Sequence, residues 1–302
     1  MNASSTIIIP QRNHVPARLP DAQRLGELAT WALEEEARLT PKPALVDRRG
    51  SGAHADMDLA MLLRSADMLA PYFARLADTA ATVPLGVALR SRLGAIGREA
   101  EIAMLAATGG INTHRGAIWA LGLLVAAVAS LHRCTGETWS ARPDAHAICH
   151  RAALIARLPT LAESCASHGN AMRARYGARG ARGEAHDGFF HVRKVALPAL
   201  RAARLRYREE NTARLHTLLA LIVRLEDTCL LYRGGIDALT FAQATGARVL
   251  EFGLDTDDGW RVLDELDRGL IARNASPGGS ADLLAATLLL DRIDGDSNHG
   301  NA

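Results

Sequence analysis

Apolar residues recur every three or four positions through nearly all of this 302-residue chain, and no long stretch alternates apolar with polar residues. A spacing of about 3.6 residues is that of an amphipathic α-helix, whereas a half-buried strand repeats every two residues. The clearest stripe lies in residues 85–107, with Arg90, Arg98 and Glu101 outside it; its members are Leu85, Leu89, Leu93, Ile96, Ala100 and Met104. Ala and Leu, which favour helices, dominate, while aromatic residues make up only 4%. The chain is therefore predicted to be all-α.

Prolines, glycines and short polar clusters divide this pattern into segments. Helices are predicted over 21–39, 56–80, 85–107, 115–132, 143–158, 160–176, 192–208, 211–232, 236–252, 257–273 and 280–292. Neither a repeat nor a linker separates them. Residues 20–293 are thus expected to form a single multi-helix globular domain, with a flexible N-terminal tail at 1–19 and a flexible C-terminal tail at 294–302.

Composition argues against several classes of protein. The formal net charge is +2, too small to indicate a nucleic-acid partner. Lys42 and Lys194 are the only lysines and neither follows a glycine, so there is no Walker A phosphate loop. The longest apolar run, 117–131, is shorter than the ~20 residues that a membrane span needs, so it is predicted to be a buried helix. The four cysteines lack C-x-x-C spacing, which is typical of reduced thiols in a cytoplasmic protein.

Four loops rich in Gly, Pro, His or Arg lead into predicted helices, at 40–58, 109–116, 177–186 and 276–282. A helix N-terminus presents unpaired N–H groups and the positive end of the helix dipole, and glycine lets a ligand approach the backbone. Such loops suit phosphate. Each loop could instead be simple helix punctuation. Because four such loops carry charged residues, an active site is predicted where these helix N-termini cluster.

The loop 40–58 holds the densest set of candidate ligands. Two prolines stiffen the backbone around Lys42, and His54, Asp56 and Asp58 converge at a helix start. Carboxylates at this spacing suit Mg²⁺ held by one or two acids together with substrate phosphates. The alternative is that one aspartate caps the helix while the other is solvated.

Asp227 is a different kind of signal. In a helix over 211–232 it would lie beside Val223, Leu230 and Leu231, on or near the buried face. A buried carboxylate must be paired, hold a metal or be protonated, and the alternative to a functional role is an ion pair with Arg224 or with another helix.

The loop 177–186 carries Arg179, Arg182, Glu184 and His186 between glycines. Arginine binds phosphate oxygens through charge-assisted and often bidentate hydrogen bonds. The sequence therefore predicts a second phosphate-binding loop here, or else a mobile surface loop.

Several motifs in and around these loops occur in order over roughly residues 25–290. They are Thr40-Pro41-Lys42-Pro43, Leu45-Val46-Asp47, Gly52-Ala53-His54, Asp56-Met57-Asp58, Ile111-Asn112-Thr113-His114, Gly116-Ala117-Ile118, Gly180 to Glu184, Asp227-Thr228, Arg233-Gly234-Gly235, and Ser276 to Leu284. In these motifs the chain resembles the triphosphoribosyl-dephospho-CoA synthase family, with Ala44 where the family has Gly and Arg115 where it has Lys.

The resemblance implies that ATP and 3′-dephospho-CoA give 2′-(5″-triphosphoribosyl)-3′-dephospho-CoA and free adenine. ATP would then donate its ribosyl group rather than a phosphoryl group. The product would be the prosthetic-group precursor for an acyl carrier protein, that of malonate decarboxylase, with that of citrate lyase as the alternative. The implied partners are the two substrates and the carrier-protein transferase of the same pathway, and a homodimer is a further expectation.

Loss of adenine should develop oxocarbenium character at the ribose, which defines the roles that the site must fill. The triphosphate is expected to bind Lys42, Arg115, Arg182 and Arg233, with Mg²⁺ on Asp56, Asp58 or Asp227. Asp227 or His54 is the candidate base for the 2′-hydroxyl, and His114 or Glu184 the candidate partner of departing adenine. Asp47, Asn112, Ser280 and Asp282 complete the predicted substrate-binding residues.

Two other classes of protein use a similar set of residues. An all-α metal-dependent nucleotide phosphohydrolase would release ADP, AMP or pyrophosphate and no adenine. A non-catalytic nucleotide-binding protein would bind ATP without turnover. The products formed from ATP and dephospho-CoA distinguish all three.

Overall fold

Twelve α-helices make up most of the described part of the chain, which is residues 20–135, 143–160 and 168–295 of a computed structural model. They are α1 (Ala22–Arg38), α2 (Leu59–Thr82), α3 (Val87–Ala107), α4 (Arg115–Thr135), α5 (Ala145–Arg157), α6 (His168–Tyr176), α7 (Gly180–His186), α8 (Leu197–Arg206), α9 (Glu210–Arg224), α10 (Thr228–Phe252), α11 (Asp257–Ala272) and α12 (Gly278–Gly295), with a π-helical turn η1 (Val192–Ala196). Within these residues the only β pairing is an isolated bridge between Asp47 and Gly50. The all-α prediction is confirmed.

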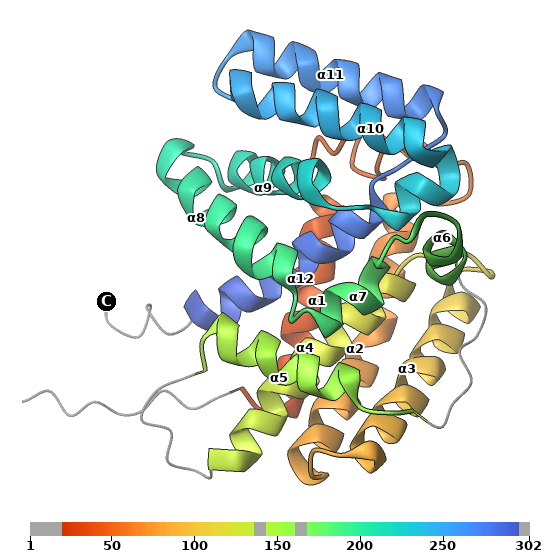
Figure 1. Cartoon of the computed structure of the whole chain (residues 1–302), viewed down its shortest axis with the longest axis vertical. Helices are drawn as coiled ribbons and strands as arrows, with labels where there is room; N and C mark the ends of the chain where they lie inside the picture. The colour runs from red at the N-terminus through yellow and green to blue at the C-terminus, as the bar shows by residue number, and fades with distance from the viewer. Residues whose placement is uncertain (1–19, 136–142, 161–167, 296–302) are drawn as a thin grey trace, which may run out of the picture.

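The centre of the molecule is built from α1, α2, α4 and α12 (Figure 1). Both α2 and α12 pack against α1 and against α4. Their apolar stripes meet in one core, where Leu28, Leu69, Leu121 and Leu284 are no more than 2% exposed. The last helix of the chain therefore runs through the core beside the first, and its N-terminus lies inside the protein.

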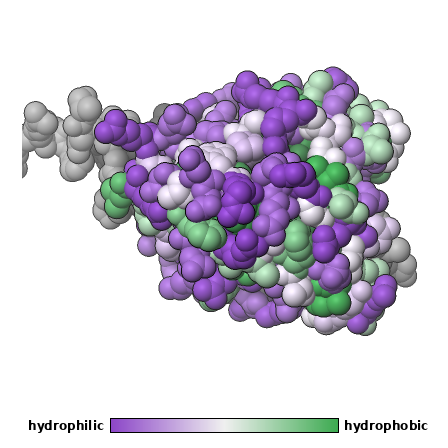
Figure 2. Space-filling view, turned by 90° about the horizontal axis from the view of Figure 1, so that it is seen from above, coloured by the Kyte–Doolittle hydropathy of each residue, from purple (hydrophilic) through white to green (hydrophobic). Residues whose placement is uncertain are grey.

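α4 is apolar on nearly every side. Its segment Arg115–His132 is long and apolar enough to cross a membrane, yet 72% of that segment is buried inside the protein. This confirms the prediction of a buried core helix. The surface seen in Figure 2 is mainly hydrophilic, and its apolar residues are exposed in separate patches.

α10 and α11 form a hairpin at one end of the molecule (Figure 1). α10 is kinked at Gly235, whose φ of 66° and ψ of −162° lie outside the helical region and favour glycine. The first turns of α10, which carry Arg233, therefore follow a different axis from the rest of the helix.

Three predicted segments differ from the structure. The single helix expected over 211–232 is two, because α9 ends at Arg224 and α10 begins at Thr228. The loop expected at 177–186 contains the short helix α7, and the helix expected over 192–208 begins as η1, just before Pro198, which has no N–H to donate. The start of the helix expected over 160–176 and the tail 1–19 lie outside the described residues, whereas α12 continues into the predicted C-terminal tail as far as Gly295.

Candidate active site

A cavity of about 730 Å³ opens among the core helices. Its walls come from the loop after α1, from one face of α3, and from the first turns of α4, α7, α10 and α12. This volume is typical of a small-molecule site. Four helices therefore begin at one cavity, and the positive ends of their dipoles give its wall a positive character.

Most of the predicted site residues line this cavity. They are Lys42, His54, Asp56, Asn112, His114, Arg115, Arg182, Glu184, Arg233 and Asp282. Asp47, Asp58, Asp227 and Ser280 are not part of its wall. The carboxylates of Asp47, Asp58 and Asp227 accept hydrogen bonds from the backbone of the surrounding loops and helix starts. The Ser280 hydroxyl donates to Asp227.

Lys42 forms a buried ion pair with Glu36 of α1. Lys42 is 1% exposed, and its Nζ lies 2.7 Å from Glu36 Oε1 and donates to the Glu36 carbonyl at 2.8 Å. A buried charge of this kind needs its partner, since removing one member leaves the other uncompensated. The ammonium therefore already has a carboxylate partner.

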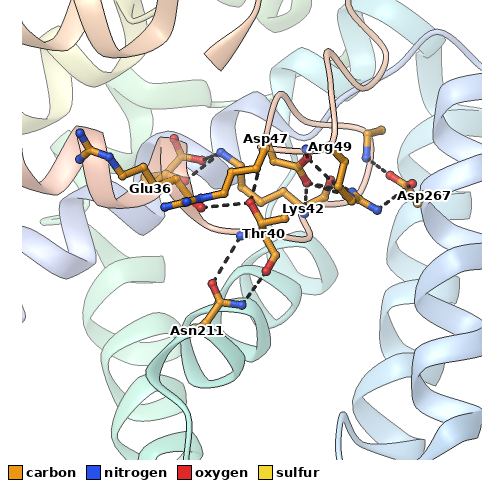
Figure 3. A network of polar contacts seen from close by, with 10 residues as sticks. Glu36, Thr40, Lys42, Asp47, Arg49, Asn211 and Asp267 are labelled. Carbon is orange, nitrogen blue, oxygen red and sulfur yellow. Dashed lines mark hydrogen bonds and ion pairs between the residues drawn. The ribbon is translucent and has the colours of Figure 1, made fainter. Parts of the chain in front are cut away.

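The loop around Lys42 is fixed from three sides (Figure 3). Asp47 accepts from the backbone N–H of Lys42 at 2.8 Å and from Arg49 Nε at 2.9 Å. Asp267 of α11 accepts from the backbone N–H of Ala44 at 2.7 Å, and Asn211 of α9 donates to the Thr40 carbonyl at 2.6 Å. Asp47 is 3% exposed, and its carboxylate shapes the loop from behind the cavity wall.

His54 is held by Arg233 and Ser276. A guanidinium only donates, so Arg233 Nη1, 3.1 Å from His54 Nδ1, makes that nitrogen an acceptor. The Nε2 then carries the proton and donates to Ser276 Oγ at 2.9 Å. Burial, followed by the Arg233 charge, lowers the pKa of His54 to about 4. His54 is therefore neutral, and both ring nitrogens are occupied.

Arg233 is equally committed to the protein. It donates to the carbonyl of Asn274 at 2.8 Å, to Asn274 Oδ1 at 2.8 Å and to the carbonyl of Ala53. These bonds join the loop before α2, the kinked start of α10 and the turn after α11. The guanidinium is thus a structural link that also faces the cavity.

Asp227 caps two helices at once. Its carboxylate accepts from the backbone N–H groups of Cys229 at 2.9 Å and Leu230 at 3.4 Å, at the start of α10. It also accepts from Gly279 N at 3.2 Å, Ser280 N at 2.7 Å and Ser280 Oγ at 2.9 Å, at the start of α12. Burial raises the pKa of Asp227, and these hydrogen bonds oppose the shift. The prediction that Asp227 is buried is confirmed, but its expected place inside a helix is wrong, because its cap starts a new helix.

Asp282, in the first turn of α12, is a partly buried carboxylate that lines the cavity. Its side chain has no hydrogen-bond partner among the residues that the structure describes. Burial, followed by the charges of Glu36 and Asp227, raises the pKa of Asp282 well above its ordinary value. A Cβ at Gly116 would lie 2.0 Å from Asp282 Oδ2, so glycine at that position lets the carboxylate approach the start of α4.

His114 lies just before α4 and is 4% exposed. Its Nδ1 lies 2.8 Å from Ser65 Oγ, which in turn is 2.7 Å from Thr113 Oγ1. Burial, followed by the charge of Lys42, lowers the pKa of His114 to about 4. The ring is therefore neutral, and no described residue bonds its Nε2 while the residue lines the cavity.

Glu184 in α7 is bonded to His191. Its Oε1 accepts from the backbone N–H of His191 and its Oε2 lies 2.7 Å from His191 Nδ1. The hydrogen bond from Glu184 raises the pKa of His191. Both oxygens accept, so the carboxylate fixes the turn after α7 at the cavity edge.

The three predicted metal ligands do not converge. Asp58 caps α2 by accepting from Met61 N at 2.7 Å, and Asp227 is occupied as described. The Asp56 side chain is 59% exposed and lines the cavity, 3.9 Å from His54 Nδ1. In the described ranges no group of three or more His, Cys, Asp or Glu residues is placed to hold a metal ion. A Mg²⁺ ion that arrives on nucleotide phosphates needs only one or two carboxylates, which Asp56 and Asp282 could supply.

The loop before α4 supplies two further predicted residues. Asn112 Oδ1 accepts from the backbone N–H of Arg115 at 3.1 Å, which caps the helix. The Arg115 Nε lies 3.2 Å from Glu101 Oε2 of α3, and both side chains are 36% exposed. This pair links α3 to the start of α4, and both residues line the cavity.

Several lining residues were not predicted as site residues from the sequence, among them Glu36, Arg90, Arg98 and Trp119. Arg90 and Arg98 lie on the cavity face of α3, and Arg90 is only 7% exposed. Arg90 stacks on the Trp119 ring at 4.9 Å from its centroid. Arg90 and Arg98 lie outside the apolar stripe of this helix, which predicts that they face solvent. Helical periodicity does not distinguish a face that borders a cavity from one that faces solvent.

Comparisons with known proteins show which family the chain is similar to. A family model described as ATP:dephospho-CoA triphosphoribosyl transferase matches residues 22–301. The chain is 51% identical over 276 residues to a protein of Pseudomonas fluorescens (strain Pf-5) named "Probable 2-(5''-triphosphoribosyl)-3'-dephosphocoenzyme-A synthase", covering 90% of this chain and 92% of that protein. It is 48% identical over 273 residues to the "2-(5''-triphosphoribosyl)-3'-dephosphocoenzyme-A synthase" of Klebsiella pneumoniae, covering 90% and 95%. No solved structure matches the chain.

Proposed function

Because this chain belongs to the ATP:dephospho-CoA triphosphoribosyl transferase family, we propose that it transfers the triphosphoribosyl group of ATP to the 2′-hydroxyl of 3′-dephospho-CoA. The bond between the ATP ribose C1″ and adenine N9 breaks, and a bond forms between C1″ and the acceptor 2′-oxygen. The hydroxyl loses a proton, and adenine leaves with one. The triphosphate remains on the transferred ribose.

The observation that carries this mechanism is an open carboxylate and a neutral imidazole in one buried cavity. Asp282 has no hydrogen bond to a described residue, and its raised pKa makes it a stronger base than an ordinary aspartate. The other two candidate bases are less suited: Asp227 accepts five hydrogen bonds, and the His54 Nδ1 lone pair already accepts from Arg233. We therefore assign Asp282 as the acceptor of the 2′-hydroxyl proton.

His114 is the better partner for departing adenine. As a neutral ring with its Nε2 free of described partners, it can donate a hydrogen bond to a purine nitrogen. Glu184 accepts at both oxygens, so it is assigned to positioning. In this mechanism Lys42, Asp47, Arg233 and Ser280 hold the loops and helix starts, while Asn112, Arg115 and Arg182 contact substrate.

Mg²⁺ is proposed to enter on the nucleotide phosphates and to bind Asp56, whose exposed carboxylate lines the cavity. The bound ion would neutralise phosphate charge. Removal of Mg²⁺ with EDTA should then stop turnover, and excess Mg²⁺ should restore it.

The products test the whole proposal. With ATP and dephospho-CoA, the enzyme should release one adenine for each triphosphoribosyl-dephospho-CoA formed, measured by liquid chromatography and mass spectrometry. ADP, AMP or pyrophosphate without adenine would instead support a phosphohydrolase. Nucleotide binding in calorimetry without either product would support a non-catalytic protein.

The family resemblance also supports a set of proposals about context. The product would serve the acyl carrier protein of malonate decarboxylase, after a transferase of the same pathway attaches it. Reconstitution with the malonate decarboxylase carrier and with the citrate lyase carrier tests this choice. A cytoplasmic homodimer is proposed as well, and light scattering of the purified protein tests its mass.

A further inference from the structure

The cavity face of α3 carries two arginines with a glycine between them. Arg90, Gly94 and Arg98 are spaced four residues apart, so they lie in one row along the helix. All three line the cavity, together with Gly97. A Cβ built on Gly94 would lie 3.3 Å from Arg90 Nη1 and 3.5 Å from Arg98 Nη1. Both guanidinium groups therefore fold over the same glycine.

These charges lack acidic partners. Arg90 is 7% exposed, its Nε is buried without a hydrogen bond, and no described carboxylate pairs with it. Burial, followed by the charges of Arg182 and Arg98, lowers the pKa of Arg90. Burying an unpaired cation beside other cations is unfavourable unless an anion joins them.

A third arginine reaches the same place from α7. Arg182 lies 5.9 Å from the centroid of the Trp119 ring, on which Arg90 also stacks at 4.9 Å. Trp119 is itself fixed, since its Nε1 donates to the Ala181 carbonyl at 3.2 Å. The nearby acid, Glu101, is paired with Arg115. The aromatic ring thus orders two guanidinium groups without neutralising them.

There is also room for a ligand. A Cβ on Gly97 would meet no atom within 4 Å, so the helix backbone there borders open space. Small residues on this face let a ligand approach α3 while the arginines flank it.

We propose that Arg90, Arg98 and Arg182, ordered by Trp119 and spaced by Gly94 and Gly97, bind the oligophosphate chain of a nucleotide substrate. This phosphate-binding role rests on the proposed transfer reaction, in which ATP brings three phosphates and dephospho-CoA brings two. The guanidinium forks supply charge-assisted hydrogen bonds to phosphate oxygens. This site replaces Lys42 and Arg233 as the main phosphate contacts, because both are already paired within the protein.

Calorimetric titration of the full-length protein tests the site with three probes: inorganic tripolyphosphate, ATP and dephospho-CoA. Arg90→Gln and Arg98→Gln should each lower the affinity for at least one of the two nucleotides by about 10-fold or more, which is the loss expected for a charge-assisted hydrogen bond. Arg92→Gln is the matched control, since Arg92 is exposed on the same helix and does not line the cavity. It should change each affinity by less than about twofold.

The pattern of loss assigns the source of the phosphates. If the variants bind ATP and tripolyphosphate more weakly but bind dephospho-CoA with unchanged affinity, the triphosphate of ATP binds at this site. If only dephospho-CoA binds more weakly, the diphosphate of dephospho-CoA binds at this site. Gly97→Leu provides an independent variant, because it fills the open space without removing charge and favours the helix. It should lower the affinity for the same probe that the arginine variants bind more weakly.

Unchanged affinities for all three probes in Arg90→Gln, Arg98→Gln and Gly97→Leu would overturn the site. That result is separate from failure of the proposed function. Phosphate binding that depends on Arg90 in a protein that forms no adenine would retain the site and remove the reaction.

Discussion

The two sides of the cavity treat charge in opposite ways. On the side of the loop after α1 and the starts of α10 and α12, Lys42 is paired with Glu36, and Arg233 and Asp227 are fully hydrogen-bonded. On the side of α3 and α7, Arg90 and Arg182 have no acidic partner among the described residues. The difference indicates that the first side is a preorganised frame and the second awaits an anion. Two open carboxylates are exceptions on the paired side, the exposed Asp56 and the more buried Asp282.

The largest expected effect tests the second of these exceptions. Asp282→Asn should lower kcat for adenine release by about 10²–10⁴, because the proton acceptor is lost. Its melting temperature should be unchanged or higher, since the variant removes a buried charge near Glu36. Asp78→Asn, an exposed position on α2 outside the cavity wall, is the control. Full activity in Asp282→Asn would remove this residue from the chemistry.

The frame itself is tested by Glu36→Gln. Leaving Lys42 buried without its carboxylate should reduce the free energy of unfolding by about 3–5 kcal/mol in urea titrations. The double variant Glu36→Gln with Lys42→Met should recover much of that loss. Glu99→Gln, at an ion pair with Arg75 whose side chains are about half exposed, should cost less than about 1 kcal/mol. Equal losses at the two sites would contradict a buried frame.

A smaller effect follows from His114, whose pKa falls from 6.5 to about 4 on folding. Between these values the unfolded chain binds a proton that the folded chain does not, so this histidine reduces stability as the pH falls through that window. The slope is about 1.4 kcal/mol per pH unit. The stability difference between the unmodified protein and His114→Gln should change with this slope from pH 6.5 towards pH 4. A pH-independent difference would show that His114 is charged in the fold.

The smallest effects separate the two aspartates before α2. Asp58→Ala should cost about 1 kcal/mol through loss of the helix cap, and Asp56→Asn should raise the Mg²⁺ concentration needed for half-maximal rate without changing the melting temperature. Thermal melts and Mg²⁺ titrations measure both. A change in Mg²⁺ dependence in Asp58→Ala alone would place the metal outside the cavity.

Much of the fold follows from local pattern. The stripe in residues 85–107 predicted α3 (Val87–Ala107) within two residues, because one face of that helix meets the core. The pattern failed where apolar residues run on through a helix end. Val223 and Leu230, seven residues apart, keep the helical period across Asp227, but α9 ends at the extended residue Leu225 and the Asp227 cap starts α10.

The candidate site was less accessible from sequence, for a related reason. Loops rich in Gly, Pro and charge did indicate where the helix starts meet. Whether each charged side chain is paired, buried or open to the cavity, however, depends on residues that are distant in the sequence. Glu36 is hidden in a run of three glutamates, and only the structure shows that it is the one buried against Lys42. Arg90 lies outside the apolar stripe, as a solvent-facing residue would, yet it is buried, and its guanidinium lies over the Trp119 ring of α4.

The carboxylate of Asp227 also defines a boundary along the chain. It holds the residues directly after it and, 53 positions later, Ser280. The two ends of the α10–α11 hairpin are therefore joined through a single side chain, because Asp227 holds both the start of α10 and the start of α12. Its tip near Gly253 lies at the end of α10 and carries none of the residues that line the cavity. The tip is attached as well, because the Leu254 N–H donates to Tyr207 Oη at 3.3 Å and Asp255 pairs with Arg206 at 2.6 Å. The hairpin is therefore held at both its base and its tip, so a change in its length would break at least one of these two attachments.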